Sequence, residues 1–160
     1  MKLYLVRHAN ALESSSVDYE RELSQKGNAQ CVDLRNFIAS KKITSNNKLH
    51  CSAAYRTKGT CSRIFTSYED VSFHKSLYLA SASELLTFIS ALETTTDVFL
   101  IGHNNGLSDL ASYLTGKSVG MKTAACVEIE FPFEDSKFIS KGIGEIISYH
   151  RCDIGDLHYL

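Results

Sequence analysis

The 160-residue sequence lacks the features that mark secreted, membrane-spanning and nucleic-acid-binding proteins. Its formal net charge is only −1, so no general attraction to nucleic acid or to an anionic membrane is expected. No apolar run approaches the roughly 20 residues that a membrane span needs. The apolar run at the start of the sequence is also too short for a signal peptide. We therefore expect a cytoplasmic protein that binds neither nucleic acid nor membrane.

Cysteine is present, but not in a pattern that binds zinc or builds a disulfide framework. The five cysteines are odd in number and never stand in C-x-x-C spacing, which fits a reducing compartment. They are Cys31, Cys51, Cys61, Cys126 and Cys152. Repeats, low-complexity tracts and linkers are also missing, and the single proline, Pro132, marks the end of a predicted strand. These absences predict one domain over residues 1–160, long enough to bury a sizeable core.

Short apolar runs alternate along the chain with segments of helical periodicity. Strands are predicted at 3–6, 49–51, 71–73, 97–102, 126–131 and 144–149. The strand at 126–131 alternates in polarity, as a strand nearer a sheet edge does. Helices are predicted after Ser24 as N-cap, over 53–65, after Ser83 as N-cap, and over 107–114 with Gly116 as the stop. The alternation predicts a single-domain α/β sandwich with a largely parallel central sheet flanked by helices.

Three predicted strands end in residues that carry chemistry. The first ends in Arg7 and His8, the second leads to Arg56, and the strand at 97–102 is followed by His103. Ligands bind at the carboxyl ends of the strands in open parallel sheets, so these side chains are expected to converge. Two arginines and two histidines with few carboxylates nearby form an anion site rather than a metal site. We expect no metal or organic cofactor.

This set of side chains can carry out phosphoryl transfer. Arginine binds phosphate oxygens in a bidentate manner and keeps its charge at any working pH. A neutral imidazole with the correct nitrogen facing outward can attack phosphorus. A second imidazole can donate a hydrogen bond to the equatorial oxygens as charge develops on them.

The segments that carry these residues resemble the signatures of the histidine phosphatase superfamily. LYLVRHANA resembles the Arg-His-Gly signature of that superfamily. LIGHNNGLSDLASYL resembles its Gly-His-Asn-Pro-Gly segment, and CSAAYRTKGT is similar to the segment that supplies the second arginine. The Asp-x-x-Arg-x-Leu-Ser-x-x-Gly pattern of the short SixA-type phosphohistidine phosphatases matches DYERELSQKG. The resemblance covers about residues 1–131, and the chain length matches that branch. No single motif is very specific, but four in this order are.

The resemblance implies a phosphoglycerate mutase-like fold, a monomer and a set of site residues. His8 would accept the phosphoryl group, and Arg7, Arg56 and His103 would complete the phosphate pocket. Arg21 would reach the mouth of the same pocket, although a surface ion pair with its acidic neighbours explains it equally well. The implied substrate is a phosphorylated histidine on a phosphotransfer protein of a phosphorelay or sugar-transport system.

The sequence departs from the family pattern at two positions and lacks one expected group. Ala9 replaces the signature glycine, which is difficult if that position needs a positive φ. Asn105 replaces a frequent proline, a milder change because asparagine can still precede a helix. No carboxylate stands between His74 and Leu79, where the mutase-like branch has an acid, and the next one is Glu84. Because neutral imidazole leaves with less help than an alkoxide, the missing acid favours a phosphoramidate substrate.

Several alternatives remain open at this stage. The chain could be a phosphatase for a small phosphorylated metabolite, or a non-catalytic module that binds phosphate or phosphohistidine. A cysteine-dependent phosphatase is disfavoured, because four residues separate Cys51 from Arg56 where that chemistry needs five. Cys51 is expected in the core and Glu84 in the exposed first turn of a helix. The remaining histidines are expected to be structural or at the surface: His50, His74, His150 and His158.

Overall fold

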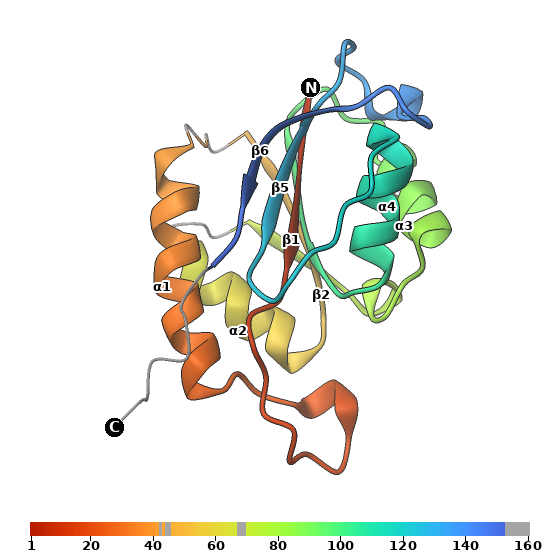
Figure 1. The fold of residues 1–160 in the computed structure, drawn as a ribbon. Helices are drawn as coiled ribbons and strands as arrows, with labels where there is room; N and C mark the ends of the chain where they lie inside the picture. The colour runs from red at the N-terminus through yellow and green to blue at the C-terminus, as the bar shows by residue number, and fades with distance from the viewer. Residues whose placement is uncertain (42, 44–45, 67–69, 153–160) are drawn as a thin grey trace.

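A computed structural model describes residues 1–41, 43, 46–66 and 70–152, which are built around one six-stranded sheet (Figure 1). The strands are β1 Lys2–Arg7, β2 Lys48–Ser52, β3 Val71–His74, β4 Val98–Gly102, β5 Cys126–Glu130 and β6 Glu145–His150. Their order in the sheet is β3-β2-β4-β1-β5-β6. The pairs among β3, β2, β4 and β1 are parallel, whereas β5 is antiparallel to both β1 and β6. The predicted, largely parallel α/β sheet is therefore confirmed.

Helices cover both faces of this sheet (Figure 1). The α-helices are α1 Gln25–Ser40, α2 Tyr55–Ile64, α3 Ala82–Ser90 and α4 Gly106–Thr115, and three short 3-10 helices are η1 Asp18–Glu20, η2 Lys75–Leu77 and η3 Ser136–Phe138. Helices α1 and α2 lie on one face, and α3 and α4 lie on the other. Tyr4 and Val6 belong to the core cluster under α1 and α2, while Leu3 and Leu5 belong to the one under α3 and α4. The apolar run at 3–6 is continuous because β1 is covered on both faces.

Two of the predicted helix boundaries are confirmed and one is wrong. Ser24 is the N-cap of α1 and accepts a hydrogen bond from the Gly27 amide at 3.0 Å. Gly116 ends α4 with a φ of 67°, a conformation that glycine adopts without steric cost. The N-cap of α3 is Ser81, not Ser83. Ser81 is the cap because Glu84 stands three residues later and its side chain accepts a hydrogen bond from the Ser81 amide, which completes a capping box.

The alternating strand β5 lies next to the edge strand β6, and one of its polar residues is buried. Glu128 is 1% exposed and accepts hydrogen bonds from Lys2 at 3.0 Å and Lys41 at 2.7 Å. Ser148 on β6 also donates to it, at 2.6 Å. Burial alone would favour the protonated form, but these hydrogen bonds outweigh it and lower the pKa of Glu128 to about 2. Polarity alternation in β5 therefore marks a buried ion cluster rather than a solvated face.

The described helices set one further limit on the protein. None of them is long and apolar enough to cross a membrane. Residues 153–160, which include His158 and the predicted end of the domain, lie outside the described part of the chain.

Candidate active site

The structure brings Arg7, His8, Arg56 and His103 together at one edge of the sheet. They follow the carboxyl ends of β1, β2 and β4, which are neighbours in the order β2-β4-β1. Arg56 Nε lies 3.3 Å from His8 Nε2. The ring centroids of His8 and His103 are 5.3 Å apart. Parallel strands direct their carboxyl ends to the same edge, which is why residues up to 96 positions apart in the sequence meet there.

Two hydrogen bonds fix the proton on the His8 ring. Nδ1 lies 2.7 Å from the Ala9 carbonyl oxygen, which can only accept, so Nδ1 carries the proton. Arg56 Nε donates to Nε2, which therefore presents a lone pair. Burial, reinforced by the positive charges of Arg56 and Arg7, lowers the pKa of His8 from 6.5 to about 4. At neutral pH His8 is an uncharged imidazole whose Nε2 lone pair accepts a hydrogen bond from Arg56, and Nε2 can attack an electrophile once that hydrogen bond opens.

Ala9 fits its position without backbone strain. Among the described residues other than glycine, a positive φ occurs only at Leu79, Glu93 and Ala124. Ala9 is fully buried, and its amide donates to Thr60 Oγ1 at 2.9 Å. The other departure, Asn105, is the N-cap residue of α4 and makes no side-chain capping hydrogen bond.

His103 is held by a serine that the sequence analysis did not single out. Its Nε2 lies 2.7 Å from Ser52 Oγ at the end of β2, and both residues are buried. Its Nδ1 is buried and has no hydrogen-bond partner among the described residues. Burial, with the neighbouring His8 and Arg56, lowers the pKa of His103 to about 3. Both histidines of the site are thus neutral at pH 7.

The Arg7 guanidinium is incompletely paired. Its Nη1 donates to the Met121 carbonyl at 2.9 Å, while its buried Nε has no partner in the part of the chain that the structure covers. No carboxylate of the described residues forms an ion pair with it. Burial and the nearby Arg56 lower the pKa of Arg7, the direction expected for a cation without a counter-ion. An anion bound beside Arg7 would supply that missing charge.

Asp18 organises the mouth of the site, a role the sequence analysis missed. Arg56 donates to the Asp18 carbonyl at 2.7 Å and to its Oδ2 at 3.0 Å. Arg21 donates to Oδ1 at 3.1 Å and to the Leu12 carbonyl at 2.6 Å. Arg21 therefore forms the ion pair with an acidic neighbour that was one of the two expectations, and its role in binding phosphate stays a prediction. The one feature of the sequence that could have indicated this role is the position of Asp18 at the start of the Asp-x-x-Arg pattern.

The carboxylate of Asp18 is unsuited to donating a proton. The hydroxyl of Tyr78 donates to its Oδ2, and together with Arg21 and Arg56 it holds the pKa of Asp18 well below the usual range. Glu84 belongs to the N-terminal capping box of α3, as expected for an exposed residue in the first turn. Neither carboxylate is poised to protonate a leaving group.

Cys51 is the core residue that the sequence predicted. It is fully buried in the cluster under α1 and α2, and burial raises the pKa of its thiol. A buried, protonated thiol is a poor nucleophile, which argues against the cysteine-dependent alternative.

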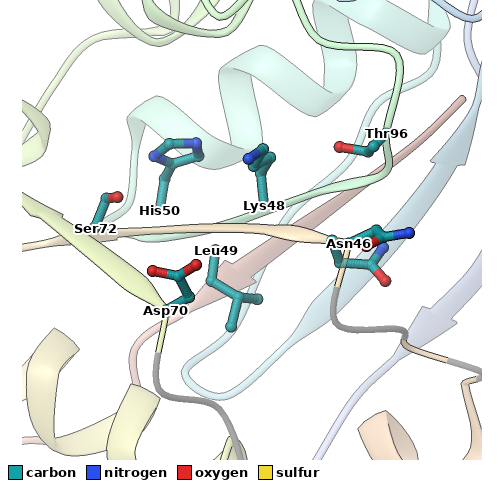
Figure 2. A pocket seen from close by; sticks show the side chains of 8 residues that line it. Asn46, Lys48, Leu49, His50, Asp70, Ser72 and Thr96 are labelled. Carbon is teal, nitrogen blue, oxygen red and sulfur yellow. The ribbon is translucent and has the colours of Figure 1, made fainter.

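A cavity lies at the amino end of β2, opposite the end that leads to the candidate active site (Figure 2). Its volume is about 310 Å³, and Lys48, His50, Asp70, Ser72 and Thr96 are among its lining residues. His50 Nδ1 lies 3.0 Å from Nε2 of His74. This cavity contains none of the predicted site residues and is separate from the candidate active site.

The sequence matches no family model and no curated protein, but the fold matches solved structures over nearly its whole length. A protein from Nakamurella multipartitia assigned as a SixA phosphohistidine phosphatase is 18% identical, with a TM-score of 0.81 over 95% of this chain and 96% of that one. The protein histidine phosphatase SixA with tungstate is 18% identical, with a TM-score of 0.77 over 93% and 96%. Phosphoserine phosphatase from Entamoeba histolytica is 13% identical, with a TM-score of 0.68 over 95% and 98%. The chain has the phosphoglycerate mutase-like fold of the histidine phosphatases.

Proposed function

We propose that this protein is a phosphatase that accepts a phosphoryl group on His8 and acts on phosphohistidine in a phosphotransfer protein. The observation that carries the proposal is the His8 ring, which is neutral, has its Nδ1 proton bonded to the Ala9 carbonyl and directs Nε2 toward Arg56. The likeness to SixA phosphohistidine phosphatases supports the same reading at the level of the fold.

In the first step the lone pair of His8 Nε2 attacks phosphorus. The P–N bond to the substrate imidazole breaks, and its electron pair leaves with the imidazole nitrogen. Arg7, Arg56 and His103 hold the phosphoryl oxygens as charge builds on them. The His8 ring becomes cationic as Nε2 bonds to phosphorus, and the Ala9 carbonyl at 2.7 Å from Nδ1 stabilises that charge.

In the second step water hydrolyses phosphorylated His8. The water oxygen bonds to phosphorus, the P–Nε2 bond breaks, and its electron pair returns to Nε2. Both water protons leave with the phosphate as dihydrogen phosphate, which then passes one proton to solvent. The site offers no carboxylic acid to the first leaving group, since Asp18 is held ionised by its partners. A substrate imidazole protonated on its other nitrogen leaves as a neutral molecule and needs no such acid.

The test follows phosphoryl loss from a phosphohistidine-bearing phosphotransfer domain, with p-nitrophenyl phosphate assayed in parallel. Wild-type protein is compared with His8→Ala and with His150→Ala. His150 is a matched control because it binds Asp33 and stacks on Phe37, away from the site. With a radiolabelled substrate and an alkaline quench, wild type should carry label on His8 after a single turnover.

We expect rapid loss of phosphohistidine, slow hydrolysis of the aryl ester, and no activity in His8→Ala. Full activity in His8→Ala would rule out His8 as the nucleophile. Faster hydrolysis of the aryl ester would favour a phosphatase for a small metabolite. Binding of the phosphorylated domain without turnover or label would identify a non-catalytic module.

A further inference from the structure

Three tyrosines gather beside the candidate active site, and we call Tyr19, Tyr55 and Tyr78 the tyrosine wall. Tyr19 lies in η1, Tyr55 begins α2, and Tyr78 follows η2. The ring of Tyr19 meets the ring of Tyr78 edge-on, with centroids 4.9 Å apart and planes 79° apart. The Tyr19 and Tyr55 centroids are 6.4 Å apart. Three segments far apart in the sequence thus present aromatic rings at one place.

Tyr78 joins this wall to the reacting groups. Its ring lies edge-on to His103, with centroids 5.4 Å apart and planes 88° apart. The guanidinium carbon of Arg56 lies 5.8 Å from the centre of the same ring. Because His103 and Arg56 both adjoin His8, Tyr78 is separated from the nucleophile by a single side chain. Tyr78 is only partly buried, so a bound molecule can contact its ring.

The hydroxyl of Tyr78 is already engaged, so the ring is what this residue offers to a ligand. The hydroxyl donates to Asp18, and that hydrogen bond raises the pKa of Tyr78 above its usual value. A phenol with a raised pKa is a weak acid toward a leaving group. The ring of Tyr19 packs against the Tyr78 ring at nearly a right angle and supports its orientation independently of the hydroxyl.

Resting on the proposed function, we propose that Tyr78 determines substrate specificity by packing its ring against the imidazole of a phosphohistidine. A phosphoryl group bound at His8 Nε2 would face Arg56, and the group that carries it would extend past Arg56 toward the Tyr78 ring, whose centre lies 5.8 Å from the guanidinium carbon. An imidazole ring there gains an aromatic contact that an amine or alkyl group does not gain. Tyr78 therefore favours the ring-borne phosphoramidate over a phosphoramidate without a ring.

The experiment compares two substrates that share a P–N bond and differ in the ring. These are a phosphohistidine peptide and phosphoramidate itself. The measured quantity is the ratio of their kcat/KM values in wild type, Tyr78→Leu, Tyr78→Phe and Tyr113→Leu. Tyr113 is a matched control because it is 40% exposed and lies near the C-terminal end of α4. An aromatic contact of this kind changes the ratio by about threefold to tenfold.

We expect Tyr78→Leu to lower the ratio by about threefold to tenfold, mainly because kcat/KM for the phosphohistidine peptide falls. Tyr78→Phe and Tyr113→Leu should keep the wild-type ratio. An unchanged ratio in Tyr78→Leu overturns the proposal. A ratio in Tyr78→Phe that falls as far as in Tyr78→Leu also overturns the proposal, because the hydroxyl and not the ring would then set the preference for the peptide. If the wild-type protein hydrolyses neither substrate, the proposed function itself fails, and that result is distinct from both.

Discussion

At the scale of single residues, the environment of each histidine sets its chemistry. His8 and His103 are both buried beside arginines, and both pKa values lie well below 6.5. Their two rings nevertheless have different partners. His8 Nδ1 is bonded to a carbonyl that can only accept, whereas His103 Nε2 meets a hydroxyl that can donate or accept.

The two pKa values can be tested by NMR. We expect the His8 and His103 ring resonances to keep their neutral-form shifts as pH falls from 8 to 5, because burial penalises the imidazolium. The protonated form of His8 should reach half population near pH 4. Resonances assigned with His8→Ala that titrate near pH 6.5 would contradict the neutral, nucleophilic His8.

Ser52 is expected to position His103 rather than touch the substrate. Its hydroxyl lies 2.7 Å from His103 Nε2 and also accepts a long hydrogen bond from the Ala54 amide at 3.5 Å, so it fixes the orientation of the imidazole. Ser52→Ala should lower kcat about 10-fold or more through a misplaced donor, with a smaller change in KM. Ser52→Thr, which keeps a hydroxyl, should recover part of that loss. Equal kcat values for wild type and Ser52→Ala would show that His103 needs no such partner.

At the scale of elements, the glycine of the Leu-Ser-x-x-Gly pattern has a packing role. A Cβ on Gly27 in α1 would lie 2.0 Å from the Asn10 carbonyl oxygen. That close approach fixes the loop after β1, where Ser24 also binds Asn10. The serine and the glycine of the Leu-Ser-x-x-Gly pattern therefore hold the loop that follows His8 against the start of α1.

Gly27→Ala should destabilise the protein by about 1–3 kcal/mol, although alanine is the better helix former. The matched control is Gly59→Ala in α2, where the added Cβ meets no backbone and only side-chain atoms of Leu23 at 3.3 Å and Arg63 at 3.5 Å. We expect the control to change the free energy of unfolding by less than about 1 kcal/mol. Denaturant unfolding measures both, and equal effects at the two glycines would contradict the close approach of α1 to the loop.

At the scale of the whole molecule, stability should fall in mild acid. The pKa values of His8, His50 and His103 are about 4, 4 and 3, against 6.5 in an unfolded chain. Between pH 6.5 and 4 the unfolded state binds more protons, so the free energy of unfolding decreases as pH falls through this window. Above about pH 7.5 these three groups contribute little pH dependence, because the imidazoles of the unfolded chain are then also mostly neutral.

When the protein unfolds at pH 5, these three histidines together should take up about three protons from solution. Urea unfolding at pH 7.5, 6 and 5 measures the slope of stability against pH. His50→Gln should reduce the slope by about one proton without affecting catalysis, because His50 lines the cavity at the amino end of β2 and not the candidate active site. A stability that stays constant from pH 7.5 to 5 would show that these imidazoles are not held neutral.

Much of this protein follows from local sequence signals. The periodicity of apolar residues predicted the six strands and four main helices, because strand and helix each impose their own spacing on residues that face a core. Arg7, His8, Arg56 and His103 were found because each follows a strand end within a recognisable motif. The capping choice at α3 was missed because Ser81 and Ser83 are both acceptable caps, and only the reach of Glu84 separates them.

The sequence by itself determined the fold class and the four side chains that converge at the strand ends. Only the tertiary structure shows the contacts of Asp18, Ser52 and Tyr78, which meet the candidate site from separate segments. Tertiary packing also decided that Glu128 is a buried ion rather than a surface charge. The physical reason is that strand and helix patterns depend on neighbours in the chain, whereas hydrogen bonds and pKa values depend on neighbours in space.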